Sequence, residues 1–85
     1  MKQELDKNGC FKISLIRDTT ESPTRYYMPA EYGEVVYFEA NGRQDFVFKA
    51  PMFVEKKLRE IGISFSQVMM QNPKSSKNTN VMVKV

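Results

Sequence analysis

The sequence predicts a β-rich α+β fold: a small five-stranded barrel with one short helix between the third and fourth strands. Residues 10–17 and 81–85 alternate between apolar and polar side chains, as half-buried strands do. Asn41-Gly42 separates two runs rich in β-branched and aromatic residues, which is a strong hairpin signal. Residues 51–61 carry apolar side chains at helical spacing. An open antiparallel sheet covered by one helix is the alternative architecture.

The first strand is predicted over residues 10–17, where Phe11, Ile13 and Leu15 share one face. The polar residues 1–9 before it are expected to form either a flexible arm or a short strand that turns into it. A chain of 85 residues is expected to be one domain, covering 1–85.

The connection after this strand, residues 18–32, is long and rich in turn-forming residues. It contains Arg25, Tyr26 and Tyr27, which could form a short strand that ends at Pro29. Connections of this length often carry function, so these three side chains are candidate ligand contacts.

A two-residue turn at Asn41-Gly42 fixes the register of the hairpin expected over residues 34–49. The face expected to pack in the core carries Val35, Tyr37, Phe46 and Phe48. The opposite face mixes apolar and charged side chains: Glu34, Val36, Phe38, Arg43, Asp45, Val47 and Lys49. Because that second face is more apolar than a solvated surface requires, it is expected to contact a ligand or a subunit.

The helix is expected to begin near Pro51, which suits a first turn, and to end before Gly62. A fourth strand is predicted from residue 63 onward, and a polar loop over residues 72–80 leads to the last strand, residues 81–85.

Composition excludes most catalytic and metal chemistry. The chain has no histidine and a single cysteine, Cys10, so no zinc site, metal ligand set or histidine-based catalysis is expected. No cofactor motif is present, and we expect a protein that is not an enzyme. The polar N-terminus and the lack of a long apolar run favour a cytoplasmic protein without a membrane anchor.

Charge is unevenly distributed, and this suggests an anionic partner. The first 42 residues carry five basic and seven acidic side chains, whereas the remaining 43 carry eight basic and three acidic ones. A basic half suits a phosphate backbone or an acidic protein surface.

A helix between strands three and four resembles the element order of an OB-fold. This resemblance implies binding of single-stranded DNA or RNA without strong sequence preference, on the surface of strands two and three and the loops after strands one and four. The residues expected to contact phosphates are Arg25, Arg43, Lys49, Lys74 and Lys77. The aromatic residues expected to stack on bases are Tyr26, Tyr27 and Phe38.

The alternative function is a non-catalytic protein-interaction module or inhibitor, of the kind that viruses and mobile elements direct at host proteins. Six methionines and the partly apolar hairpin face suit an adaptable contact surface. Because a domain this small has marginal stability, a homo-oligomer such as a homodimer is also expected.

Overall fold

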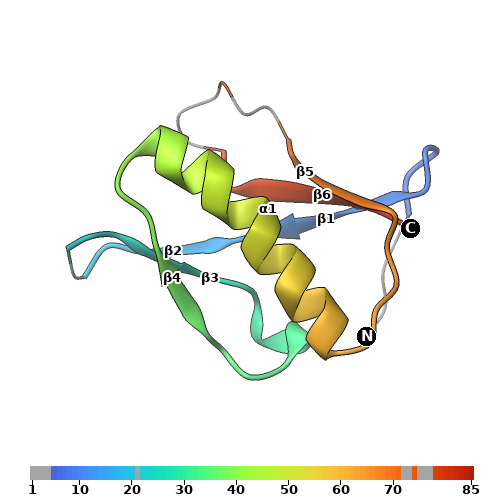
Figure 1. Ribbon diagram of the computed structural model, residues 1–85, viewed down its shortest axis with the longest axis horizontal. Helices are drawn as coiled ribbons and strands as arrows, with labels where there is room; N and C mark the ends of the chain where they lie inside the picture. The colour runs from blue at the N-terminus through green and yellow to red at the C-terminus, as the bar shows by residue number, and fades with distance from the viewer. Residues whose placement is uncertain (1–4, 21, 72–73, 75–77) are drawn as a thin grey trace.

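The computed structural model describes residues 5–20, 22–71, 74 and 78–85. The strands form two three-stranded antiparallel sheets, and a long helix crosses in front of them (Figure 1). The first sheet has the order β1 (Cys10–Ser14), β6 (Asn80–Lys84) and β5 (Gln67–Met70). The second sheet has the order β2 (Ile16–Asp18), β3 (Arg25–Tyr27) and β4 (Tyr37–Glu39). The helices are a short 3-10 helix, η1 (Ala30–Tyr32), and α1 (Arg43–Glu60).

The two sheets are joined through β1 and β2, which follow each other almost without a break. Leu15, the residue between them, is buried, and its backbone N–H donates to the carbonyl of Thr79 at 3.0 Å. Phe11, Ile13 and Leu15 all face the core, so the predicted alternation of the first strand is confirmed. One run of chain therefore pairs with β6 at its start and with β3 at its end.

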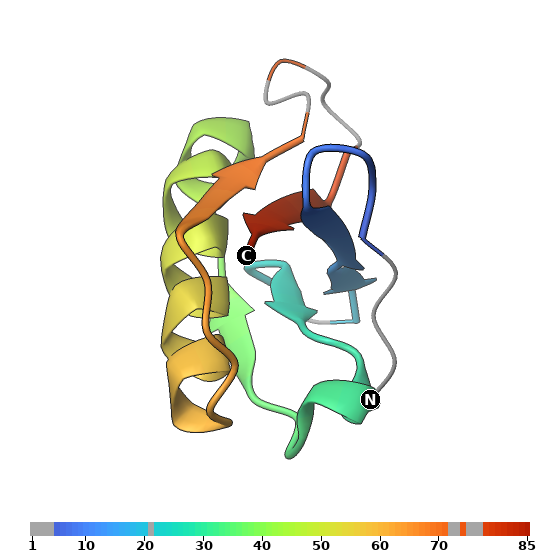
Figure 2. The same cartoon turned by 90° about the vertical axis from the view of Figure 1, so that its right-hand side faces the viewer.

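The predicted five-stranded barrel is wrong, and the open arrangement with a covering helix fits better. Among the described residues β4 and β5 each pair with only one neighbour, so the strands do not close on themselves. The helix stands along one side of the curled strands instead (Figure 2). Two lysines tie it to the chain around β4: Lys49 Nζ donates to the Glu39 carbonyl at 3.0 Å and Lys57 Nζ to the Glu34 carbonyl at 2.8 Å.

The predicted hairpin around Asn41-Gly42 is also wrong, because the residues that follow the turn begin α1. The helix buries an apolar stripe spaced four residues apart: Phe46, Ala50, Val54 and Leu58. Side chains four residues apart lie on one helix face. This face packs against both sheets, because Phe46 contacts Tyr26 and Phe38 of the second sheet and α1 also contacts β5 and β6 of the first. The helix predicted over residues 51–61 corresponds only to the second half of α1.

Pro51 lies inside α1, where it removes one backbone hydrogen bond at a cost of about 3 kcal/mol. The four buried side chains outweigh this loss, since burying one large apolar side chain contributes roughly 1.5–3 kcal/mol. Two exposed ion pairs at helical spacing add a smaller contribution: Asp45–Lys49 at 3.0 Å and Glu55–Arg59 at 3.3 Å. Tertiary burial therefore overrides the proline and the β-forming tendency of this segment.

The helix changes which aromatic side chains are buried. Phe46 is 1% exposed, whereas Phe48, which the hairpin register placed beside it in the core, is 69% exposed. Two residues separate side chains by about 200° around a helix but return them to the same face of a strand. The prediction for Tyr37 is inverted as well, since Tyr37 is 42% exposed and Phe38 turns toward the helix.

The remaining elements follow the sequence more closely. The last strand forms where it was predicted, and its Val81 and Val83 are fully buried. The fourth strand begins at Gln67 rather than at residue 63. Before β1, the Asp6 carboxylate accepts the backbone N–H of Cys10 at 3.0 Å, which closes a turn. Neither helix of the described residues combines the length and apolar character that crossing a bilayer requires.

Candidate functional site

The outer face of the second sheet carries two tyrosines, of which Tyr37 is exposed and Tyr27 is half-buried. Alternation along β3 and β4 directs Tyr26 and Phe38 toward α1 and leaves their neighbours on the opposite face. Two cross-strand rows occupy that opposite face: Ile16–Tyr27–Tyr37 and Asp18–Arg25–Glu39. We call Arg25, Tyr27 and Tyr37 the tyrosine face.

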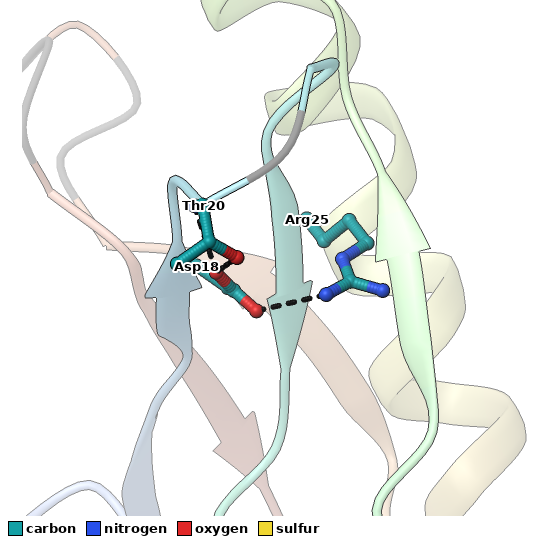
Figure 3. A network of polar contacts seen from close by, with 3 residues as sticks. All are labelled: Asp18, Thr20 and Arg25. Atoms are coloured by element: carbon teal, nitrogen blue, oxygen red, sulfur yellow. Dashed lines mark hydrogen bonds and ion pairs between the residues drawn. The ribbon is translucent and has the colours of Figure 1, made fainter.

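The three side chains of the tyrosine face contact one another. The ring centroids of Tyr27 and Tyr37 are 5.0 Å apart, with 46° between the ring planes. The guanidinium carbon of Arg25 lies 4.4 Å from the centroid of the Tyr37 ring. Arg25 Nη2 also forms an ion pair with Asp18 Oδ2 at 3.0 Å, across from β3 to β2 (Figure 3). The result is a cation and two aromatic rings held side by side on an open sheet.

Asp18 holds this arrangement in place. The hydroxyl and the backbone N–H of Thr20 donate to Asp18 Oδ1 at 2.6 and 3.0 Å (Figure 3). These two hydrogen bonds, followed by the hydrogen bond and charge of Arg25, hold the pKa of Asp18 below its ordinary value of 3.8. Asp18 is therefore ionised at neutral pH, and it positions the guanidinium of Arg25 over Tyr37.

A cavity of about 270 Å³ adjoins Tyr37 where β4 meets α1. Its lining is half apolar or aromatic and half charged: Val36, Tyr37, Phe53, Lys56, Lys57 and Glu60. Lys57 is held by the Glu34 carbonyl, whereas Lys56 is exposed. The cavity, which we call the helix-edge cavity, therefore combines an apolar wall with two cationic side chains and one carboxylate.

Of the aromatic residues predicted to bind, only Tyr27 belongs to the tyrosine face, where it is half-buried beside Tyr37. Tyr26 and Phe38 are also half-buried, but on the helix side of the sheet, with their ring centroids 5.5 Å apart. Tyr26 lies 4.5 Å from the centroid of Phe46, and Phe38 lies 4.7 Å from that of Phe53. Both rings therefore pack mainly under the helix.

The predicted basic residues are dispersed. Arg25 belongs to the tyrosine face, whereas Arg43 begins α1 and donates to the Asn78 carbonyl. Lys49 forms an ion pair with Asp45 at 3.0 Å. The pKa of Asp45 is lowered mainly by a hydrogen bond from the backbone N–H of Asn41 and, to a smaller extent, by Lys49. The other two predicted contacts are Lys74, which is exposed between β5 and β6, and Lys77, which lies outside the described residues.

Sequence reasoning missed Tyr37 and Lys56 as candidate contacts. Tyr37 and Phe38 are adjacent, so in a strand one must face inward and the other outward. The identities of the two residues do not show which one faces inward, because both side chains are large and aromatic. The choice follows from the packing of Phe38 on Phe46 and Phe53, which depends on the helix.

The described residues include no cluster of histidine, cysteine, aspartate or glutamate side chains that could hold a metal ion. The chemistry that the tyrosine face offers is stacking, through aromatic rings and a planar guanidinium, rather than bond making.

Comparison of the chain with protein-family models, with curated proteins and with solved structures gives no match. The function must therefore be argued from the geometry of the tyrosine face and its surroundings.

Proposed function

We propose that this protein binds single-stranded DNA or RNA without strong sequence preference, and that the tyrosine face stacks on the bases. The observation that carries the proposal is the contact of Tyr27, Tyr37 and Arg25 on a sheet face that the helix does not cover. Single strands are bound on such platforms because every base has a π-face that can stack on an aromatic ring or a guanidinium.

Phosphate groups would be held beside this platform by cationic side chains. Lys56 and Tyr37 both line the helix-edge cavity. The guanidinium of Arg25 contacts the same Tyr37 ring. The helix-edge cavity would hold a second unstacked base against the apolar wall formed by Val36 and Phe53. No cofactor is needed for this function, and a cytoplasmic location remains part of the proposal.

The experiment is a fluorescence-anisotropy titration of the protein into a labelled single-stranded oligonucleotide. Titrations at roughly 50 and 200 mM salt should show weaker binding at the higher salt, because phosphate contacts release counterions. A duplex of the same sequence should bind more weakly, since its bases cannot reach the rings. No binding to the single strand at the lower salt would refute the proposal.

Two variants locate the binding surface. Tyr37→Ala should weaken binding by roughly 5–150-fold, the effect of losing one base–aromatic stack. Phe48→Ala is the matched control, because Phe48 is an exposed aromatic residue on the solvent side of α1, away from the tyrosine face. Equal losses in the two variants would show that the tyrosine face is not the binding surface.

A protein-interaction module is the second candidate, and one observation favours it. Phe48 and Met52 are one turn apart on α1 and are 69% and 57% exposed. Such a pair on a helix suits a contact with a second copy of this chain, as the expected homodimer would provide. Light scattering over a concentration series tests it: Phe48→Ser with Met52→Ser should abolish a dimer that the unchanged protein forms. A monomer at all concentrations would contradict self-association.

A further inference from the structure

Glu39 places a carboxylate on the outer face of the second sheet, beside the rings that are proposed to stack on bases. It follows Tyr37 by two residues on β4, so the two side chains lie on the same side of the strand, roughly 6.6 Å apart along it. Across the sheet Glu39 pairs with Arg25, which completes the row Asp18–Arg25–Glu39. The surface proposed to receive a nucleic acid therefore includes an acidic side chain next to Tyr37.

The side chain of Glu39 is exposed, and within the part of the chain that the structure describes it forms no hydrogen bond or ion pair. Its cross-strand neighbour Arg25 forms an ion pair with Asp18 at 3.0 Å. Lys49 donates to the backbone carbonyl of Glu39, but its ion pair is with the carboxylate of Asp45. Both neighbouring cations therefore pair with other carboxylates, and the side-chain oxygens of Glu39 remain available to a ligand.

The charge of Glu39 restricts which part of a nucleic acid can lie beside it. Like charges repel, so an unpartnered carboxylate opposes the approach of a phosphate group. An ionised carboxylate only accepts hydrogen bonds, and such charge-assisted bonds are stronger than neutral ones. In a single strand the bases carry N–H donors, whereas the phosphates carry none. Glu39 is therefore suited to contact the edge of a base rather than the backbone.

Opposite charges flank Tyr37 along β4. Glu39 is the last residue of the strand. Lys56 lines the helix-edge cavity together with Tyr37, and the next residue of α1, Lys57, donates to the carbonyl of Glu34, which precedes the strand. Lys56 therefore lies toward the start of β4 and Glu39 at its end. A base that stacks on Tyr37 can direct its phosphate toward Lys56 and its hydrogen-bonding edge toward Glu39.

We propose that Glu39 selects guanine at the position that stacks on Tyr37, an inference that rests on the proposed function. The Watson–Crick edge of guanine presents N1–H and the N2 amino group side by side, and these two donors match the two oxygens of one carboxylate. Adenine, cytosine, thymine and uracil each place an acceptor beside the donor on that edge. Selection at one position is a modest preference, which is compatible with binding to strands of any sequence.

The test compares labelled oligothymidines of about five nucleotides, a length within the range of small single-strand sites, by fluorescence anisotropy at the lower salt concentration. The strands differ only in the central base, which is thymine, guanine or hypoxanthine. Hypoxanthine is guanine without the N2 amino group, so it offers one of the two donors. The guanine strand should bind roughly fivefold or more tightly than the thymine strand, as a bidentate contact to a base does. The hypoxanthine strand should bind more weakly than the guanine strand.

Glu39→Gln separates selection from affinity. Glutamine replaces one acceptor oxygen with a donor and removes the negative charge, so the variant should bind the guanine and thymine strands equally. It should bind the thymine strand at least as tightly as the unchanged protein does, because a repulsion is lost. Glu55→Gln is the matched control: it removes a carboxylate of α1 that pairs with Arg59, and the guanine preference should persist. The circular dichroism spectrum of each variant checks that its fold is retained.

Three results would overturn the inference and leave the proposed function standing. They are equal binding of the guanine and thymine strands by the unchanged protein, a hypoxanthine strand that binds as tightly as the guanine strand, and a guanine preference that persists in Glu39→Gln. The first two need no variant. A failure to bind any of the strands would instead refute the proposed function, and this inference with it.

Discussion

The guanidinium of Arg25 on β3 lies 4.4 Å from the centre of the Tyr37 ring on the neighbouring strand β4. The contact is diagonal, because Arg25 pairs with Glu39 and Tyr37 pairs with Tyr27. Asp18 holds the other side of the guanidinium at 3.0 Å. The planar groups that would receive a base are therefore arranged before any ligand arrives, which lowers the entropic cost of binding.

The Asp18–Arg25 contact should make stability depend on pH in a defined range. The pKa of Asp18 is lowered in the folded state, mainly by Thr20, so the stability it contributes is complete above its ordinary value of 3.8. That contribution is lost as the pH falls through the lowered pKa. Urea unfolding of Asp18→Asn and of the unchanged protein should therefore differ at pH 6 and converge toward pH 2. A difference that stays constant over this range would contradict the account.

Phe46 and Phe48 test the position of the helix, because they are close in sequence but opposite in burial. Phe46→Ala should lower the free energy of unfolding by about 3–5 kcal/mol, because it removes a large side chain from the core. Phe48→Ala should change the free energy of unfolding by at most roughly 0.5 kcal/mol, as exposed substitutions do. Thermal unfolding followed by circular dichroism measures both changes. A larger loss for Phe48→Ala would restore the hairpin register and refute the helix.

Pro51→Ala should stabilise the protein. Alanine restores the missing helical hydrogen bond, and the gain of up to about 3 kcal/mol exceeds the roughly 0.4–1 kcal/mol that proline saves by restricting the unfolded chain. Met52→Ala, at the exposed neighbouring position, is the control and should have little effect. Urea unfolding at neutral pH compares the two variants. A loss of stability in Pro51→Ala would mean that the proline ring itself is required for packing.

The sequence was sufficient where local pattern and burial agree. The alternation of Phe11, Ile13 and Leu15 placed the first strand and its core face, and the valines near the C-terminus placed the last. Tyr26 and Tyr27 occupy a short strand before Pro29, as the sequence suggests, with one ring on each face.

The sequence was misleading where two periods fit the same residues. Phe46-Val47-Phe48 after Asn41-Gly42 has the appearance of the second strand of a hairpin. The spacing of Phe46, Ala50, Val54 and Leu58 is helical, but Pro51 lies within it. Because proline disfavours the interior of a helix, this spacing does not predict one continuous helix. The error had a consequence for the candidate site, because the wrong register directed Phe38 outward and Tyr37 inward.

The most direct test of the tyrosine face is an NMR map of the protein during titration with a short single-stranded oligonucleotide. Stacking on a base should move the ring proton signals of Tyr27 and Tyr37 upfield, and the largest amide shifts should fall on Arg25–Tyr27 and Tyr37–Glu39. Unchanged tyrosine rings, or shifts confined to the Phe48 and Met52 side of α1, would contradict the account.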